Sequence, residues 1–468
     1  MTFTALDSTI ASVLFLLFLY LKHSKTPRTS NLPLPPGPRV WPIIGSFLSL
    51  PNNSEPHWIW FTRWANKTAS DVIHCRVFGV NTIVLNSREA AVDLLERRSN
   101  IYSDRPRMVM AGELVGWNRM VAISNYSDRI KTIRKYMHNS ISSRTSQDWQ
   151  PQQEQEAIRF LQKLRRSPEN LISHIRHTAG ATVVRLVYAY TPKDEDDEYI
   201  KIAERAMGNF SLATTPGMFL VDLFPLCTCL IINGIGLWYE KVDRDLGQLV
   251  KYLPWAPFKR TALEWRKQLF ELIDVPMAFA RDQMNRGVAE PSFVSKWLDE
   301  PGRESDKLLI PFTAASLYAG GANTTVSAIS TFFVAMLHYP EAQKLAQKEI
   351  DEVFGKDRLP TLADRDSLPY VEALYKEVLR WQPLGPLGVP HRLGSDVDDE
   401  YRGMRIPANS IVIPNIWNML HDPSIYPSPE TFDPSRYFGT NQPNPEDVAF
   451  GFGRRMRIVK PLPWDQRG

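Results

Sequence analysis

A long apolar segment, from Leu308 to His338, sets the strongest limit on the fold, because its spacing predicts a single helix. Two adjacent glycines, Gly320 and Gly321, lie inside it. Each glycine costs roughly 1 kcal/mol relative to alanine in a helix interior. Either another helix packs very close to them, or the helix bends where a ligand approaches. Helical spacing also dominates the chain from about residue 150 onward, so we expect a mainly helical protein.

Shorter patterns predict the remaining elements. Alternating residues on both sides of Gly79-Val80-Asn81 predict a β-hairpin, and Ser87 is a good N-cap for a helix that follows it. The acidic run Asp194–Glu198 is typical of a solvated loop. The further predicted elements are helices at Gln153–Arg165, Leu263–Arg286, Glu341–Phe354 and Ser367–Trp381, and a turn and strand at Ile406–Ile413.

Composition excludes some classes of protein. The chain of 468 residues has 55 basic and 51 acidic residues, a balance too even and too dispersed for a nucleic-acid binder. Its three cysteines, Cys75, Cys227 and Cys229, are too few for a disulfide framework. The pair Cys227 and Cys229 has no second Cys/His pair nearby at zinc spacing, and its flanks are apolar. Buried structural thiols are therefore favoured over a metal site.

The N-terminus predicts a membrane anchor. Residues 8–21 form an uncharged run of about fourteen residues, and Lys22, Lys25 and Arg28 follow at once. Extended back to Met1, the run reaches the length of about 20 residues that spans a bilayer. The basic flank keeps the body of the protein in the cytosol. A cleaved signal peptide is the alternative, but there is no basic segment before the run and no clear cleavage site after it. Four prolines within Asn31–Arg39 then predict a stiff, extended hinge.

Three motifs follow in the second half of the chain. Glu377-Val-Leu-Arg380 lies on a predicted helix and, by itself, indicates only an ordinary surface ion pair. A proline-stiffened coil, Phe432-Asp-Pro-Ser-Arg-Tyr437, comes next. Near the C-terminus, residues 450–455 read Phe-Gly-Phe-Gly-Arg-Arg, the first six positions of the pattern F-G-x-G-R-R-x-C-x-G.

Together, in this order, these motifs resemble the cytochrome P450 family, and more narrowly its membrane-anchored fungal members. The set comprises the anchor, the hinge with Leu34-Pro-Pro-Gly-Pro38, the Gly-Gly helix and the three later motifs. The resemblance implies a mainly α fold with small β-sheets, the helix-rich triangular prism of that family. It divides the chain into an anchor at 1–30, a hinge at 31–45, a haem monooxygenase domain at 46–455 and an unrelated tail at 456–468.

The resemblance implies a haem b cofactor and assigns residues to it. In the family, Glu377, Arg380 and Arg436 would form a buried charge network behind the haem loop, where its role is architectural. Basic groups neutralise the two haem propionates, and the haem loop lies under the ring. By position these groups are Arg134, His391 and Arg455, and the loop contains Phe450 and Gly453. Arg134 and His391 rest on the resemblance alone, since a lone arginine is usually a surface residue. Ile130 stands where the family often has a tryptophan.

On the Gly-Gly helix, the resemblance implies a pair of catalytic residues. In the family, an acid followed by a threonine delivers protons to dioxygen. Thr324 matches the threonine, but Asn323 replaces the acid, and an amide cannot relay a proton by ionising. We expect proton delivery to need another route or to run more slowly, with more uncoupled peroxide. We also expect Asn323 to be buried.

The graver departure is at the axial ligand of the iron. Arg457 stands where the pattern has its cysteine, and Val459 where it has its last glycine. Met456 is adjacent, but a thioether would give an electron-transfer type of iron. The residues from Met456 to Gly468 do not resemble the family, and its final helix and C-terminal β region are missing. A frameshift, retained intron or wrong exon junction is favoured over an evolved cysteine-free protein.

The function implied is insertion of one atom of O₂ into a lipophilic small molecule, in fungal secondary metabolism. Electrons would come from NADPH through the flavins of NADPH–cytochrome P450 reductase, at the endoplasmic reticulum membrane. The alternative is a catalytically inactive relative, or mis-spliced product, that cannot bind haem through a thiolate. A third class, a soluble interaction protein, is disfavoured by the motif set.

Overall fold

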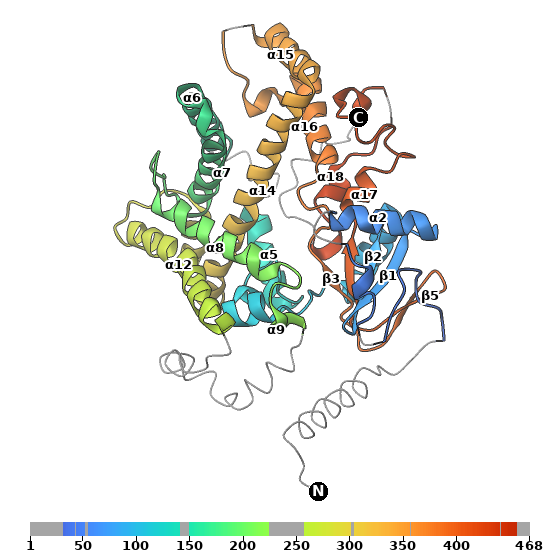
Figure 1. The fold of residues 1–468 in the computed structure, drawn as a ribbon. Helices are drawn as coiled ribbons and strands as arrows, with labels where there is room; N and C mark the ends of the chain where they lie inside the picture. Colours follow the sequence, from blue (N-terminus) through green and yellow to red (C-terminus); the bar gives the residue numbers. More distant parts are fainter. Residues whose placement is uncertain are drawn as a thin grey trace. The chain divides into compact units, whose positions relative to one another are not determined.

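The computed structural model describes residues 31–42, 44–51, 55–140, 149–223, 257–300, 304–355, 357–439 and 441–455 (Figure 1). The predicted anchor, Cys227, Cys229 and the tail with Arg457 lie outside the described residues. The chain divides into two compact units. We call them the sheet unit (Met1–Asp104, Pro390–Met419 and Phe452–Arg454) and the helical unit (Arg105–Val389, Leu420–Gly451 and Arg455–Gly468). The expected mainly helical chain with small sheets is confirmed.

The sheet unit is built on a four-stranded sheet with the order β1-β2-β6-β3. Its strands are β1 (Val72–Val77), β2 (Val80–Leu85), β3 (His391–Arg392) and β6 (Ile411–Pro414). Strand β2 pairs antiparallel with β1 and parallel with β6, and β3 runs antiparallel to β6. The predicted hairpin is present, but its turn is Phe78-Gly79, because Val77 already pairs with Val80. Both turn residues have positive φ, the backbone that matches strand twist in a two-residue hairpin.

The other elements of the sheet unit are short. Ser87 caps the predicted helix, since its Oγ accepts a hydrogen bond from the Ala90 amide at 3.1 Å. That helix begins as α3 and continues as a π-helix, η2. The bounds are η1 (Phe47–Ser49), α2 (His57–Thr68), α3 (Arg88–Ala91), η2 (Val92–Arg97), α4 (Ser99–Tyr102), β4 (Asp399–Tyr401), β5 (Met404–Ile406) and α17 (Ile416–Leu420).

The proline hinge is extended and is held by the backbone of the sheet unit. The Pro36 carbonyl accepts from the His74 amide at 2.9 Å, and the Pro33 carbonyl accepts from the Arg405 amide at 2.8 Å. Gly37 approaches strand β1 so closely that a Cβ there would lie 1.9 Å from the His74 carbonyl oxygen. Only glycine fits at this position without a shift of the backbone.

The helical unit contains the longer helices, a large apolar core and a smaller apolar cluster where α14, α15 and α16 meet. Buried residues of the core include Trp117, Val187, Leu269, Phe293 and Ala314. The elements are η3 (Val109–Val115), η4 (Trp117–Arg119), α5 (Asp128–Ser140), α6 (Gln150–Arg166), η6 (Pro168–Asn170), α7 (Leu171–Tyr188), α8 (Glu198–Thr214), α9 (Leu220–Leu223), α12 (Pro257–Asn285), α13 (Phe293–Asp299), η8 (Glu304–Leu309), α14 (Ile310–His338), α15 (Pro340–Phe354), η9 (Leu362–Ser367), α16 (Pro369–Trp381), η10 (Pro434–Tyr437) and α18 (Glu446–Ala449). The last element, η11 (Gly453–Arg455), has its first two residues in the sheet unit and Arg455 in the helical unit.

Helix α14 contains the two glycines, and they have different surroundings. Helix α7 lies beside α14 (Figure 1), and a Cβ at Gly321 would lie 2.9 Å from the Val183 side chain of α7. A Cβ at Gly320 would meet nothing within 4 Å among the described residues. One glycine therefore permits close helix packing, and the other lies on an open face. By length and composition α14 with its preceding turn could cross a membrane, but it packs against six α-helices of this unit.

The acidic run is not simply a solvated loop. Asp197 is buried and caps α8, where its carboxylate accepts from the Tyr199 amide at 2.9 Å and the Ile200 amide at 3.2 Å. It also accepts from the Tyr190 hydroxyl at 2.8 Å. The prediction was wrong for this residue because N-capping supplies hydrogen bonds that compensate for burial of a carboxylate.

Candidate functional site

Three charged residues of the helical unit form a buried network. Glu377 and Arg380, on α16, are 0% exposed, and Arg436, in η10, is 9% exposed. Arg380 makes a two-point contact with the Glu377 carboxylate, with both distances 2.8 Å. The Arg436 Nε donates to the same carboxylate at 3.0 Å. The i,i+3 pair on the helix is thus extended by a third residue from a distant segment.

Uncharged groups complete this network. The carbonyl oxygens of Leu420 and Thr431 accept from Arg380 at 3.0 and 3.1 Å, and the Pro427 carbonyl accepts from Arg436 at 3.0 Å. The Asp433 amide donates to Glu377 at 2.9 Å. Burial, with the negative charge of Glu377, raises the pKa of the neighbouring Tyr437 hydroxyl. A buried ion pair is tolerable only when its spare donors and acceptors are satisfied in this way.

A second group of buried charges in the helical unit is entirely basic. Arg455, at the end of η11, is 8% exposed and donates to the carbonyl oxygens of Ser124 and Val121, at 2.6 and 3.2 Å. Arg105 is 6% exposed and donates to the Val389 carbonyl at 2.7 Å. Arg134, on α5, is half-buried. We call Arg105, Arg134 and Arg455 the basic cluster.

The charges of the basic cluster repel one another. Burial first, and then the charges of Arg455 and Arg134, lower the pKa of the Arg105 guanidinium well below its usual value. Burial also lowers the pKa of Arg134. Guanidinium groups stay protonated in proteins, so a depressed pKa means that the charged state is under strain. An anion bound at this place would relieve the repulsion, and carboxylates match the planar guanidinium best.

The basic cluster is connected to the open face of α14. Val121, whose carbonyl accepts from Arg455, donates its amide to the Ser316 hydroxyl of α14 at 3.2 Å. Thr324 lies eight residues further along the helix, about 12 Å at 1.5 Å per residue. Its hydroxyl donates to the Gly320 carbonyl at 2.8 Å. Both predicted features of the site thus belong to one unit.

Asn323 is exposed, so the expectation that it would be buried is wrong. Gly320, Asn323 and Thr324 are spaced i, i+3 and i+4 and therefore share a face of the helix. This is the open face on which a Cβ at Gly320 would touch nothing among the described residues. The apolar composition of α14 predicted burial all round, but its middle turns are buried only on the faces that contact other helices.

The remaining predicted residues lie in or next to the haem loop and in the sheet unit. His391 is buried on β3, and its Nδ1 lies 2.8 Å from the Tyr102 carbonyl oxygen. Gly453 has φ +58°, and a Cβ there would lie 2.0 Å from the Leu95 carbonyl oxygen. A side chain at Gly453 would therefore displace the loop from η2. Phe450, half-buried, follows α18 directly in the helical unit.

No cysteine among the described residues is available to bind a metal. Cys75 is buried in β1, and burial raises the pKa of its thiol to about 12. Within the described ranges, no three His, Cys, Asp or Glu side chains group in a way that could hold a metal ion. Cys227 and Cys229, and with them the choice between structural thiols and a metal pair, lie outside these ranges.

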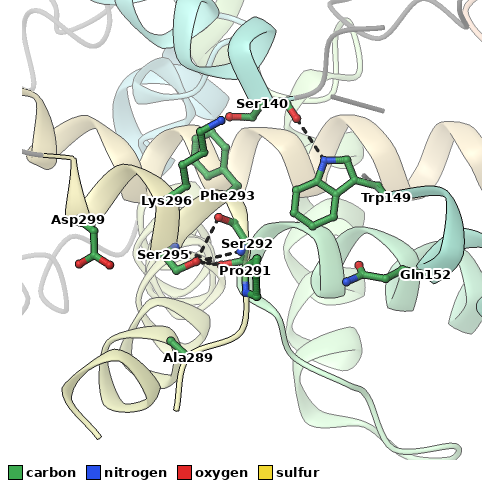
Figure 2. Close-up of a pocket in the computed structure, with 10 residues that line it drawn as sticks. All are labelled: Ser140, Trp149, Gln152, Ala289, Pro291, Ser292, Phe293, Ser295, Lys296 and Asp299. Carbon is green, nitrogen blue, oxygen red and sulfur yellow. Dashed lines mark hydrogen bonds between the residues drawn. The ribbon is translucent and has the colours of Figure 1, made fainter. Parts of the chain in front are cut away.

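A pocket of about 640 Å³ lies elsewhere in the helical unit (Figure 2). It is bordered by the end of α5, the start of α6 and the start of α13, and none of the predicted site residues lines it. Polar groups that line it are engaged in hydrogen bonds: the Ser295 amide donates to the Ser292 Oγ at 3.1 Å, the Trp149 indole donates to the Ser140 carbonyl at 3.3 Å, and the Trp297 indole donates to the Ser140 Oγ at 2.6 Å. This hollow is therefore separate from the candidate site.

Sequence reasoning missed Arg105. Its only local signal is its position before Pro106, in a segment with no helical or strand pattern. The contacts that place it are distant, with Val389 lying 284 residues further along the chain. A long-range contact of this kind leaves no trace in residue spacing.

Comparisons with known proteins agree with the motifs. A family model described as Cytochrome P450 matches residues 35–457. Cytochrome P450 monooxygenase 208 of Postia placenta is 41% identical over 459 residues, 97% of this chain and 85% of the relative. Cytochrome P450 monooxygenase claR of Ampulloclitocybe clavipes is 41% identical over 443 residues, 93% and 78% of the two chains. A monooxygenase of Armillaria gallica is 39% identical over 448 residues, 94% and 83%.

Proposed function

The chain belongs to the cytochrome P450 family, and from that premise we propose that it is a haem-dependent monooxygenase that inserts one atom of O₂ into a lipophilic small molecule. By homology the protein is a cytochrome P450 monooxygenase. The family implies haem, a redox partner and a small-molecule substrate. The observation that carries the proposal is the similarity to fungal monooxygenases over more than nine-tenths of this chain. We place its reaction in fungal secondary metabolism.

The residues at the periphery of the proposed haem site fit the cofactor. The basic cluster holds three like charges whose mutual repulsion favours an anion, and haem carries two propionates. Within the helical unit, Arg105, Arg134 and Arg455 would bind these carboxylates. Gly453 would keep the loop close to η2. The charge network of Glu377, Arg380 and Arg436 would hold the coil next to that loop without touching the cofactor.

The axial position of this sequence does not fit a thiolate-bound haem. Residue 457 is arginine, and a protonated guanidinium has no lone pair to offer the iron. A bound haem with a thiolate would activate O₂ for transfer to the substrate. We therefore assign to this chain's own residues only binding and proton-handling roles.

The open face of α14 would handle protons. The Thr324 Oγ holds its proton in a hydrogen bond to the Gly320 carbonyl, and its lone pairs remain able to accept from water or a ligand. Asn323 can donate and accept hydrogen bonds but cannot ionise. Proton delivery would thus depend on water at Thr324. Where NADPH is consumed without oxygenation of the substrate, the product would be peroxide.

The redox partner we propose is NADPH–cytochrome P450 reductase, a membrane flavoprotein. We place the protein at the endoplasmic reticulum membrane, with a single anchor in residues 1–30 and the body in the cytosol. The support is the uncharged run at residues 8–21, with Lys22, Lys25 and Arg28 directly after it. Membrane fractionation of the full chain tests the anchor, because a soluble product would contradict it.

Arg457 favours a second candidate function, a non-catalytic relative that holds a ligand without oxygenating it. The test compares the full chain with its Arg457→Cys variant, each reconstituted with haem, reduced and exposed to carbon monoxide. If the chain has the scaffold of a monooxygenase and lacks only the thiolate, the shifted Soret band of a thiolate-bound iron appears in the variant only. The same band in the unchanged chain would contradict our assignment of residue 457. If the variant binds haem without the band, the non-catalytic relative is supported.

A further inference from the structure

A second group of arginines in the helical unit alternates with aromatic rings. The Arg119 guanidinium of η4 lies 5.4 Å from the ring centre of Phe270 and 5.9 Å from that of Phe312. Arg266 of α12 lies 5.7 Å from the Phe270 ring, and Arg129 of α5 lies 5.6 Å from the Phe312 ring. Three cations and two phenyl rings thus form a continuous row, which we call the Arg–Phe row. None of these residues was assigned a role in the haem site.

The side chains of the row are accessible. Arg119 is exposed, and the other four members are half-buried. The Arg129 Nη2 donates to the Arg119 carbonyl at 2.5 Å, so the two arginines are fixed near one another. Burial, and then the charge of Arg119, lower the pKa of Arg129. The fold thus holds the positive charges of Arg119 and Arg129 close together at the protein surface.

The part of the chain that the structure describes supplies no carboxylate to this row. Arg119, Arg129 and Arg266 form no salt bridge with any described residue. The neighbouring Asp128 is paired with Lys131 at 2.8 Å, and Glu264 accepts from the Gln268 amide at 3.4 Å. A contrasting arginine is present in the same unit. The Arg358 guanidinium lies 4.3 Å from the ring centre of Phe354. Its two terminal nitrogens donate to the Asp364 carboxylate at 2.7 and 2.8 Å.

That contrast indicates what the row is built to bind. When a guanidinium covers a ring with its face, its N–H groups point outward and suit an oxyanion in the plane. At Arg358 the protein provides that oxyanion itself. At the Arg–Phe row the phenyl rings add apolar surface between the cations. We propose that the Arg–Phe row binds an amphiphilic small molecule through its carboxylate, with the apolar body of the ligand against Phe270 and Phe312.

The site does not depend on haem, so its test needs only binding. Phenylbutyrate is titrated into the full chain in non-ionic detergent by calorimetry, alongside phenylbutanamide, its neutral analogue, and inorganic phosphate, a bare anion. We expect phenylbutyrate to bind, and the amide and phosphate to bind at least about tenfold more weakly. The affinity for phenylbutyrate should fall as salt is raised. Equal binding of the amide, or of phosphate, would overturn the proposal.

Substitutions locate the site. Arg119→Gln should weaken phenylbutyrate about tenfold, because it removes one charge-assisted contact. Arg358→Gln is the matched control, because Arg358 also lies over a phenyl ring but is already paired with Asp364. It should leave the affinity for phenylbutyrate unchanged. Arg119→Lys keeps the charge and provides a second test should the glutamine variant fold poorly, with a smaller loss expected. Parent-like binding in both Arg119 variants would overturn the assignment.

Discussion

The helical unit contains two groups of three charged residues each, one in which all three residues are buried and one that includes the half-buried Arg134, and their charges are balanced differently. In the network of Glu377, Arg380 and Arg436, one carboxylate is shared by two guanidiniums and the remaining donors meet carbonyl oxygens. In the basic cluster all three charges have the same sign, and Arg105 has a strongly lowered pKa. The first group is complete by itself, so its function is to hold the fold. For the second, whose charges repel one another, we propose that it binds an anion.

Breaking the complete network should have the largest effect on stability. Glu377→Gln leaves Arg380 and Arg436 buried beside a neutral amide, and we expect the free energy of unfolding to fall by roughly 3–5 kcal/mol. Urea denaturation followed by circular dichroism measures it. Glu372→Gln is the control on the same helix, where the ion pair with Arg365 is partly exposed. It should cost less than about 1 kcal/mol. Equal losses in the two variants would remove the distinction.

Removing one charge from the basic cluster should reduce haem affinity strongly and stability little. Arg105→Gln relieves repulsion within the cluster, so we expect little loss of stability. In a chain that also contains Arg457→Cys, its haem affinity should fall about tenfold to a hundredfold, the worth of one charge-assisted hydrogen bond. Titration of the Soret absorbance measures it, with Arg358→Gln as control. If Arg105→Gln lowered the free energy of unfolding but left the haem affinity unchanged, Arg105 would belong with the structural charges.

Substituting the neutral hydroxyls of Thr324 and Thr325 on α14 should have a smaller effect than removing a charge. The hydroxyls of Thr324 and Thr325 both donate to the carbonyl four residues earlier, at 2.8 and 2.7 Å. Thr324→Val and Thr325→Val should therefore change stability equally, by less than about 1 kcal/mol. In the Arg457→Cys chain supplied with reductase, only Thr324→Val should raise the peroxide released per NADPH consumed. Equal peroxide from both variants would contradict the role given to Thr324.

His74 in the sheet unit should show the smallest effect, and only at low pH. It is buried, its Nε2 lies 3.0 Å from the Asn81 Oδ1, and burial lowers its pKa below 6.5. As pH falls through 6.5, the unfolded chain takes up a proton before the folded chain does. The folded state therefore loses stability as the pH falls from about 6.5 to the lower pKa of His74 in the folded chain. His74→Gln should flatten the fall in stability between about pH 7 and pH 5, whereas exposed His57→Gln should not.

Patterns along the sequence predicted the local elements well. The N-cap at Ser87 and the hairpin follow from short-range rules, and the Glu377 network is brought together by a helix and a coil that the motifs identify. What failed depended on distant contacts. Asp197 is buried because it caps a helix. Asn323 is exposed because no described residue covers its face of α14, and Arg105 is placed by a residue 284 positions away. Composition and periodicity contain no information about such neighbours.

The most direct test of the basic cluster uses two porphyrins without iron, so that residue 457 has no part in the result. Protoporphyrin IX and its dimethyl ester differ only in the two carboxylates, and each is titrated into the full chain by fluorescence quenching. We predict that the free acid binds at least about tenfold more tightly than the ester, and that Arg105→Gln narrows the difference. Equal affinity of the unchanged chain for both porphyrins would contradict the proposal that these arginines receive the haem propionates.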